Sequence, residues 1–402
     1  MSQNELIVRI AAKGDGVTAS GHYVAGAAPG DTVKATGIVK RGEHYVQPPC
    51  RHFERCGACE LQHCDEASLA EFVSNRVLFA AQSHGLDPQT VKPAHLSPPK
   101  SRRRATLHAV NGGGGKAMIG FREAGSHKVV GLSECDVLAP ELFALVGPLG
   151  AWLSKRKGKY AADIDMALVD QGVDCAIRNI TVEGLDQIED LLDFCRDNGV
   201  ARLGLDQGYG PEAFWEPEPV TVTLGGMPVS YPAGSFLQAT ADGERALVSA
   251  VTEWLKGCGY VADLFSGLGT FAFALGRKGQ VSAFEAARDA VLACKSANRG
   301  PSKSVETHQR DLFRNPLRPD ELAQFDGVVL DPPRAGARSQ VEQLAQISVP
   351  KIAYVSCNPS SWARDGALLI EAGYKLAEVR PVGQFRWSTH VELASLFVKG
   401  GE

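Results

Sequence analysis

The sequence predicts an α/β fold for the C-terminal part of the chain, preceded by a mixed α+β region and a small all-β segment. From residue 236 onward, short apolar runs alternate with helical windows, and the chain closes with two strands joined only by a loop. Strands and helices alternate less regularly between residues 100 and 235, and the first 47 residues contain only short strand-like runs. The expected parts are therefore 1–47, 48–235 and 236–402.

The composition is that of an ordinary globular protein. The chain has 402 residues, 44% of them hydrophobic and 22% charged, which is enough for about two to three domains. A net charge of −4 excludes a strong overall attraction to nucleic acid, and only the basic runs 102–104 and 155–159 favour it locally. The sequence shows no signal peptide and no apolar stretch of membrane-spanning length, so we expect a cytoplasmic monomer without a membrane partner.

Residues 1–47 predict a small β-barrel. Apolar and polar residues alternate from Leu6 to Ile10, and Gly14–Gly16 and Pro29–Gly30 mark hairpin turns. Barrels of this size often bind single-stranded nucleic acid, so the segment is a candidate RNA-binding unit of the OB type.

Four of the ten cysteines lie close together in the sequence, which in a cytoplasmic chain favours metal or thiol chemistry over disulfides. The spacing of Cys50, Cys56 and Cys59 allows three thiolates to converge on one metal ion or cluster. A fourth ligand has to come from Cys64 or from farther along the chain, where Cys135 is a candidate. The spacing alone leaves zinc and an iron–sulfur cluster as alternatives.

The C-terminal part has the pattern of an open α/β sheet. The expected strands are Val261–Phe265, Gln280–Phe284, Ser304–Gln309, Gly327–Leu330, Ile352–Ser356, Tyr374–Val382 and His390–Val398. Five alternating units that close with an antiparallel pair form the seven-stranded, Rossmann-like sheet of a class I methyltransferase. Upstream, residues 66–85 predict an amphipathic helix, and the prolines of 211–219 predict a linker.

The first of these strands runs into a glycine-rich turn and a helix. Gly267 and Gly269 let the backbone approach a ligand, although the turn lacks the G-x-G-x-x-G and G-K-[ST] patterns of pyrophosphate loops. Glu285 ends the next strand, where an acid can accept both ribose hydroxyls of an adenosyl ligand. Asp311 ends the third strand, where a carboxylate can contact the adenine amine. Together these features favour S-adenosylmethionine as the ligand.

Two further motifs end the next strands. In Asp331-Pro-Pro-Arg334, the arginine occupies the position where methyltransferases of exocyclic amines carry an aromatic residue. Cys357 follows the fifth strand, which the Asn358-Pro359 pair terminates, and so lies at the edge where open α/β sheets bind ligands. A lone cysteine at such a position is more often a small buried hydrophobe than a nucleophile, so its neighbours decide its role.

The motifs Asp331–Gly336, Val355–Pro359 and Thr389–Glu392, in this order, resemble the RNA 5-methyluridine methyltransferase family. The cysteine spacing is similar to that of its iron–sulfur branch, which modifies 23S ribosomal RNA, and the resemblance covers nearly the whole chain. It implies an enzyme that transfers a methyl group from S-adenosylmethionine to C5 of a uridine in RNA, with 23S ribosomal RNA as the expected substrate. The alternatives are the same reaction on transfer RNA and a non-catalytic RNA-binding or redox module.

The resemblance also implies roles for individual residues. Cys357 would add to C6 of the uracil so that C5 can attack the methyl group, and Glu392 would then remove the C5 proton. The N-terminal segment would be a TRAM-like barrel, and Thr240 stands where the family usually has Asn. The implied cofactor-binding residues are Gln238, Phe265, Thr270, Glu285, Asp311 and Asp331. The implied ligands of a [4Fe–4S] cluster are Cys50, Cys56, Cys59 and Cys135, with Cys64 as an extra thiol.

Overall fold

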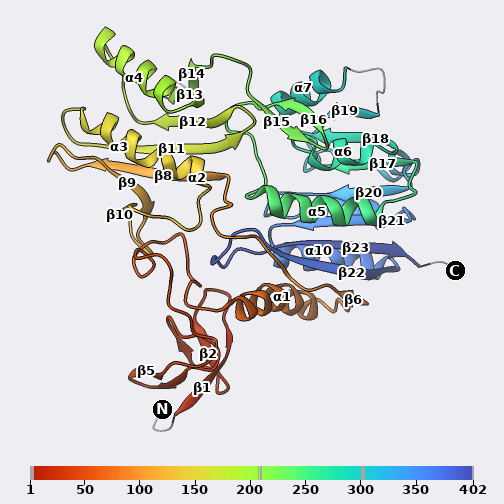
Figure 1. The fold of residues 1–402 in the computed structure, drawn as a ribbon. Helices are drawn as coiled ribbons and strands as arrows, with labels where there is room; N and C mark the ends of the chain where they lie inside the picture. Colours follow the sequence, from red (N-terminus) through yellow and green to blue (C-terminus); the bar gives the residue numbers. More distant parts are fainter. Residues whose placement is uncertain (1–3, 207, 209–210, 300–303, 401–402) are drawn as a thin grey trace.

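The structure of the protein is a computed structural model that describes residues 4–206, 208, 211–299 and 304–400. Its strands form three large sheets that follow one another along the chain, with a two-stranded hairpin between the second and the third (Figure 1). Helix α1 (Glu66–Ser83) lies between the N-terminal strands and the C-terminal sheet in Figure 1. No helix in the described part of the chain is long and apolar enough to cross a membrane.

The N-terminal sheet is antiparallel, with the strand order β3-β2-β1-β4-β5. Its alternating pattern buries Ile7 and Val33 against Ala27. The strands are β1 (Glu5–Ile10), β2 (Gly16–Thr18), β3 (Tyr23–Val24), β4 (Thr32–Lys34) and β5 (Gly37–Lys40). Among the described residues β3 and β5 are the two edges of this sheet, so the closed barrel stays a prediction.

The middle sheet has seven strands in the order β10-β9-β8-β11-β12-β13-β14, and helices α2, α3 and α4 accompany it. Only β12 and β13 pair in parallel. The strands are β8 (Arg104–Asn111), β9 (Met118–Arg122), β10 (Val129–Gly131), β11 (Tyr160–Val169), β12 (Gly172–Arg178), β13 (Val200–Asp206) and β14 (Pro211–Trp215). The helices are α2 (Pro140–Ala144), α3 (Val146–Ser154) and α4 (Leu185–Asp197).

The linker predicted at residues 211–219 is wrong in its first half. Residues Pro211–Trp215 form β14, which pairs with β13 at the edge of the sheet, a place where proline is tolerated. The chain then forms the hairpin of β15 (Thr221–Leu224) and β16 (Met227–Ser230) before it enters the C-terminal sheet.

The C-terminal sheet has the strand order β19-β18-β17-β20-β21-β23-β22-β6, and β7 also pairs with β22. Strands β17 to β21 are parallel, and β23 enters antiparallel between β21 and β22. The strands are β6 (Thr90–Val91), β7 (His95–Leu96), β17 (Tyr260–Leu264), β18 (Gln280–Glu285), β19 (Val305–Gln309), β20 (Gly327–Leu330), β21 (Lys351–Ser356), β22 (Tyr374–Gly383) and β23 (Glu392–Lys399). Strands lie at the seven predicted places, but the sheet differs from the predicted seven-stranded one: among the described residues it has nine strands, because β6 and β7 extend it from a distant part of the chain.

Two layers of helices cover this sheet. On one face α1 packs with α9 and α10, and on the other α5, α6 and α7 contribute buried residues to a separate core. The C-terminal helices are α5 (Ala241–Trp254), α6 (Thr270–Gly276), α7 (Arg288–Ala297), α8 (Pro319–Leu322), α9 (Arg338–Leu344) and α10 (Pro359–Glu371). The continuous apolar runs of the parallel strands follow from this burial on both faces.

The cysteine-rich segment connects the three sheets. The Gly57 N–H donates to the Arg122 carbonyl of β9, and the N–H groups of Glu60 and Leu61 both donate to the Trp387 carbonyl between β22 and β23. Val46, near the end of the N-terminal part, donates to a carbonyl in the same segment. The segment therefore holds middle-sheet and C-terminal residues next to each other.

Candidate active site

Cys357 follows β21 directly, as the sequence predicts. Asn358 caps α10 by accepting a hydrogen bond from the Ser360 N–H at 3.2 Å, and Pro359 begins the helix. The thiol therefore lies between a strand end and a helix start, at the carboxyl edge of the sheet. It borders a cleft of about 460 Å³ between the cysteine-rich segment, the start of the middle sheet and the C-terminal sheet. The lining residues are Gly57, Ala58, Glu60, Arg102, Arg104, Thr106, Phe121, Phe236, Arg334, Cys357, Phe385, Ser388, His390 and Glu392.

The surroundings of Cys357 keep its thiol protonated. Partial burial, followed by the nearby carboxyls of Glu392 and Asp331, raises the pKa of Cys357 to about 11, although the Arg334 guanidinium and a backbone hydrogen bond lower it. A thiol in this setting has to lose its proton in the course of a nucleophilic attack rather than before it.

Glu392 begins β23 at the same end of the sheet. Because β21 and β23 are antiparallel and Ser356 pairs with Leu393, the first residue of β23 lies beside the residue after β21. The Glu392 side chain is 6% exposed, and burial raises its pKa to about 7 although Arg104 and Arg334 lower it. A carboxyl with a pKa near neutrality can accept and return a proton at physiological pH.

Two arginine–aromatic pairs form walls of the cleft. The Arg104 guanidinium lies 4.8 Å from the Phe236 ring centre and that of Arg102 lies 5.2 Å from the ring centre of Phe385. Phe236 is 60% exposed, so its ring is available to a planar ligand. The walls therefore combine positive charge with flat surfaces.

Sequence reasoning missed these wall residues, although it singled out the basic run of 102–104. Arg103 points away from the cleft, because its side chain donates to the Gln238 carbonyl and pairs with Glu244. Arg102 and Arg104 lie on the opposite side, as residues two apart in an extended chain do. The useful signal was that side chains alternate in direction along the extended stretch 102–104, which enters β8 at Arg104, so Arg103 forms an internal ion pair while Arg102 and Arg104 line the cleft.

Four of the six predicted cofactor residues, Phe265, Glu285, Asp311 and Asp331, lie at or just beyond the carboxyl ends of adjacent strands. Leu264 pairs with Phe284 and Leu330, and Glu285 pairs with Gln309, so the ends of β17, β18, β19 and β20 meet at one edge. This is the same edge that carries Cys357 and Glu392, because β20 pairs with β21 in parallel. The structure therefore brings the two predicted groups of residues to one side of the sheet.

The turn after β17 has the backbone that its sequence requires. Gly267 and Gly269 have φ values of +54° and +86°, and Phe265 is held at +63°, which is unusual for an aromatic residue. Its ring faces that of Phe313, with centres 5.3 Å apart. Thr270 is the first residue of α6. The strained Phe265 thus projects from a tight turn beside the end of β17.

Glu285 and Asp311 both organise local backbone. Glu285 accepts hydrogen bonds from the N–H groups of Gly267, at 3.0 Å, and Ala287, at 2.7 Å. Asp311, just beyond β19, accepts from the Phe313 N–H at 3.0 Å. Each carboxylate is only partly buried and retains lone pairs for a further donor.

Gln238 connects Asp331, at the end of β20, with Gln384, the residue after β22. Its amide nitrogen lies 3.5 Å from an Asp331 oxygen, and its oxygen accepts from the Gln384 amide at 2.8 Å. Burial, with Glu392 and Asp263 nearby, raises the pKa of Asp331 well above its usual value. Thr240, the residue that departs from the family pattern, is fully buried and caps α5 by accepting from the Gly243 N–H at 2.9 Å.

Asp263, which was not predicted as a site residue, shows that the glycine turn is suited to a polar ligand. It is fully buried, and among the described residues neither of its carboxyl oxygens has a hydrogen-bond partner. Burial raises the pKa of Asp263 to about 7. The Ala272 N–H lowers this pKa from nearby, although its geometry is not that of a hydrogen bond. The Ser266 hydroxyl in the same turn is also buried without a partner. Buried polar groups are normally hydrogen-bonded, so the polar groups of S-adenosylmethionine fit this turn.

The cysteines separate into two environments. Cys50, Cys56, Cys59 and Cys135 line one narrow pocket with apolar neighbours such as Phe53 and Phe121, and burial raises the pKa of each of the four thiols. Cys64 does not line this pocket and instead forms a β-bridge with Tyr45. Among the described residues, no group of three or more His, Cys, Asp or Glu side chains that could hold a metal ion is found.

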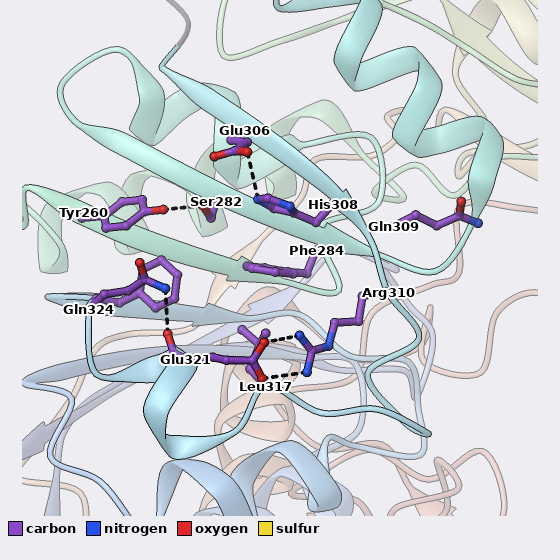
Figure 2. A pocket seen from close by; sticks show the side chains of 11 residues that line it. Tyr260, Ser282, Phe284, Glu306, His308, Gln309, Arg310, Leu317, Glu321 and Gln324 are labelled. Atoms are coloured by element: carbon purple, nitrogen blue, oxygen red, sulfur yellow. Dashed lines mark hydrogen bonds and ion pairs between the residues drawn. The ribbon is translucent and has the colours of Figure 1, made fainter.

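A second groove, of about 490 Å³, lies beside β19 and is shown in Figure 2. Its main charged groups are paired with each other: the Arg310 guanidinium contacts Glu321 at 2.6 Å and holds the pKa of that carboxyl at about 2. The hydroxyls of Tyr260 and Ser282 likewise share a hydrogen bond of 2.7 Å. This groove therefore lacks the unpartnered charged groups that mark the glycine turn and the cleft.

The fold and the site together define the class of the protein. The strand order, a glycine turn after β17 and acids at the ends of β18 and β19 are those of an S-adenosylmethionine-dependent methyltransferase. The structure of the tRNA (uracil-54, C5)-methyltransferase of Pyrococcus abyssi in complex with S-adenosyl-L-homocysteine has the same fold. It is 22% identical with a TM-score of 0.74, and the match covers 98% of this chain and 100% of that one.

Sequence comparison identifies the family. A family model described as tRNA (uracil-5-)-methyltransferase matches residues 306–399. An uncharacterized RNA methyltransferase of Zymomonas mobilis is 46% identical over 98% of this chain and 99% of its own length. The 23S rRNA (uracil(1939)-C(5))-methyltransferase of Shewanella amazonensis is 29% identical over 93% and 90% of the two chains. The chain therefore belongs to the RNA (uracil-5-)-methyltransferase family, which confirms the resemblance seen in the sequence.

Proposed function

We propose that the protein methylates C5 of a uridine in RNA through a temporary covalent bond between Cys357 and C6 of the uracil. The observation that carries the proposal is that Cys357 and Glu392 border one cleft at the sheet edge where the cofactor residues end their strands. Carbon 5 of uracil is a poor nucleophile, and addition of a thiolate at C6 turns the ring into an enolate whose C5 can attack an electrophilic methyl group.

The two titratable residues have successive tasks. The Cys357 sulfur forms a bond to C6 as its proton passes to solvent water in the open cleft, and the positive charge of Arg334 favours the thiolate. After the methyl group is added, C5 carries both the methyl group and a proton. Glu392 in its ionised form accepts that proton, the C5–C6 double bond forms again, and the bond from C6 to sulfur breaks. The pKa of about 7 suits Glu392 to this step at neutral pH.

S-adenosylmethionine, when bound, supplies the methyl group. We assign its ribose hydroxyls to Glu285, its adenine to Asp311 and Phe265, and its methionine end to Thr270 and the end of β17, where Asp263 lies. Gln238 and Asp331 lie between this ligand and the cleft, where they can hold the uracil edge. The free lone pairs of Glu285 and Asp311 and the unpartnered Asp263 support this assignment.

The proposed substrate is 23S ribosomal RNA, with transfer RNA as the alternative. The Shewanella relative favours the first, and the structural likeness to the Pyrococcus enzyme favours the second. In either RNA the uridine has to leave its stack to meet a partly buried thiol, which is easiest in a loop or bulge. The division into residues 1–47, 48–235 and 236–402 remains part of the proposal, with the first two parts holding the RNA.

We further propose that Cys50, Cys56, Cys59 and Cys135 hold a [4Fe–4S] cluster. The support is that these four thiols, and not Cys64, line one pocket. A four-iron cluster distributes its thiolates over separate iron atoms, so it needs less close convergence of the sulfurs than a single zinc ion does.

Release of tritium from RNA labelled at uridine C5 tests the reaction. Incubation of the protein with S-adenosylmethionine and labelled ribosomal or transfer RNA should release tritium, because every methylation displaces the C5 hydrogen. No release from either RNA would favour the non-catalytic alternative. Mass spectrometry of RNA from cells that lack the protein then identifies the nucleotide that loses its methyl group, and so decides between the two substrates.

A further inference from the structure

A groove of about 530 Å³ lies between the N-terminal sheet and α1, outside the catalytic cleft. It is lined by three cationic side chains, Arg9, Lys13 and Arg76, and only Asp15 among the lining residues carries a carboxylate. In Figure 1 the N-terminal strands lie directly beside α1. The groove is therefore positively charged in a protein whose net charge is −4.

The three cations of the groove are not neutralised by the protein. Within the part of the chain that the structure describes, no ion pair includes Arg9, Lys13 or Arg76. The Nε atom of Arg76 is buried without a hydrogen-bond partner, and burial lowers the pKa of this guanidinium with no carboxylate to oppose it. A buried charge is costly unless it is paired, and a guanidinium is well matched to a phosphate.

Two aromatic side chains project into the same groove from its opposite sides. Tyr23 on β3 is 66% exposed and Phe79 on α1 is 49% exposed, and both line the groove. A positively charged groove with exposed rings is how proteins hold single-stranded nucleic acid, since the phosphates meet the cations and the bases stack on the rings. A protein partner would more often meet an apolar centre, whereas here the apolar groups are interleaved with charges.

The groove adjoins the catalytic cleft. A Cβ atom added to Gly14, in the β1–β2 loop, would lie 3.2 Å from the Glu60 side chain and 3.5 Å from that of Thr389. Glu60 and His390 line the cleft. Gly14 therefore lies against the wall of the cleft, while its neighbours Lys13 and Asp15 line the groove. Burial, followed by the charges of Arg334, Arg102 and Arg76, lowers the pKa of His390, so the Arg76 charge also acts on a residue of the cleft.

We propose that this groove binds a single-stranded segment of RNA that continues from the nucleotide in the catalytic cleft. Arg9, Lys13 and Arg76 contact its phosphates, and Tyr23 and Phe79 stack on its bases. The continuity with the target uridine rests on the proposed function, whereas the binding of RNA in the groove is independent of methylation.

The test measures binding of a fluorescein-labelled, single-stranded RNA of 30 nucleotides and mixed sequence by fluorescence anisotropy, without S-adenosylmethionine. The double variant Arg9→Ala/Lys13→Ala should bind about tenfold more weakly, and the slope of log affinity against log salt should fall by about 1.4, since each phosphate contact on a single strand contributes about 0.7. The matched control is Lys34→Ala/Lys40→Ala, which removes the same charge from exposed positions of the same sheet outside the groove. It should bind like the wild type.

A second pair of variants tests stacking. Phe79→Ala should weaken binding roughly tenfold, as removal of one stacking ring does, while Tyr23→Phe, which keeps its ring, should leave the affinity unchanged. Two results would overturn the proposal that the groove binds RNA: wild-type affinity in the Arg9→Ala/Lys13→Ala variant, or equal losses of affinity in that variant and in the lysine control. Tritium release separates this outcome from the reaction: loss of RNA affinity in a protein that never releases tritium would leave the groove standing without the proposed function.

Discussion

Cys357 and a group of four other cysteines line two neighbouring hollows of this protein that share Ala58 in their walls. Cys357 borders an open cleft together with Glu392, Arg104 and Arg334. The pocket of Cys50, Cys56, Cys59 and Cys135 has a volume of only about 10 Å³, and most of its other lining residues are apolar. Gly57 and Ala58, which lie between two of these cysteines, also line the cleft.

Burial raises the thiol pKa in both places, so burial does not distinguish them. The neighbours do. Cys357 has carboxyl and guanidinium groups within reach, which can accept protons and stabilise charge while a bond forms to a substrate. The four pocket cysteines lie beside one another, and although Glu134 and Asp136 also line the pocket, four neighbouring thiols suit a shared metal cluster that replaces their protons. The comparison indicates that a thiol acquires its role from the titratable groups around it.

The largest expected effect comes from removing the Cys357 sulfur. Cys357→Ala should lower the rate of tritium release by at least about four orders of magnitude, because among the described residues Cys357 is the one thiol that lines the cleft. S-adenosylmethionine binding, measured by calorimetry, should stay within a factor of about two. Cys258→Ala, which changes another partly exposed cysteine outside the cleft, is the control and should release tritium normally. Normal turnover by Cys357→Ala would show that Cys357 is not the nucleophile, and its role would no longer differ from that of the pocket cysteines.

Glu392→Gln should slow turnover by about a thousandfold and leave the protein attached to its RNA, because the C5 proton then stays in place and the sulfur cannot leave. A band of protein–RNA adduct on a denaturing gel, dependent on S-adenosylmethionine, measures this. The same variant combined with Cys357→Ala should form no adduct. Fast release of methylated RNA by Glu392→Gln would assign the proton to another group.

The raised pKa of Glu392 also predicts a pH dependence of stability. Its pKa is raised from 4.5 to about 7 in the folded protein, so the stability it contributes is fully present below pH 4.5 and is lost as the pH rises through 7. Glu392→Gln removes this loss, so the variant should gain about 2 to 3 kcal/mol of stability relative to the wild type between pH 4.5 and pH 8, seen as a larger free energy of unfolding. Urea denaturation of both proteins at the two pH values measures the difference, and equal differences at both would mean that the folded carboxyl is not perturbed.

The smallest effect on the reaction is expected from the cysteine pocket. Cys59→Ser should reduce iron in anaerobically purified protein from about four atoms per chain to less than one, and lower the thermal midpoint by about 5 °C, while tritium release at 25 °C falls less than tenfold. Cys64→Ser changes a buried cysteine outside the pocket and should keep its iron. Stoichiometric zinc in the wild type would contradict the iron–sulfur assignment. A loss of activity in Cys59→Ser as large as that in Cys357→Ala would mean that the pocket cysteines and Cys357 do not differ in their importance for the reaction.

Local features of the fold could be predicted from the sequence. Helix α1 spans Glu66–Ser83 against an expected 66–85, and the strand Gly327–Leu330 has the bounds that its apolar run gives. These features depend on side-chain period and on turn residues, which act over a few neighbours. The placement of Cys357 followed in the same way from the Asn358-Pro359 pair.

Other features depended on residues that are far apart along the chain. Strand β7 pairs with β22 across nearly 300 residues, and two residues are too few for their pattern to predict a strand. The pairing of Arg102 with Phe385, the burial of Asp263 without partners and the groove beside Arg76 likewise arise only when distant segments pack together.

The sequence by itself determined the succession of strands and helices along the C-terminal part, the spacing of the cysteines and the identity of the two residues proposed for the chemistry, because periodicity and short motifs are local. Only the tertiary structure decided which arginines enter the cleft, which cysteine joins Cys50, Cys56 and Cys59, and where an unneutralised groove opens. Burial, pKa and charge pairing depend on the surroundings of a side chain in space, and those surroundings come from segments that the sequence keeps apart.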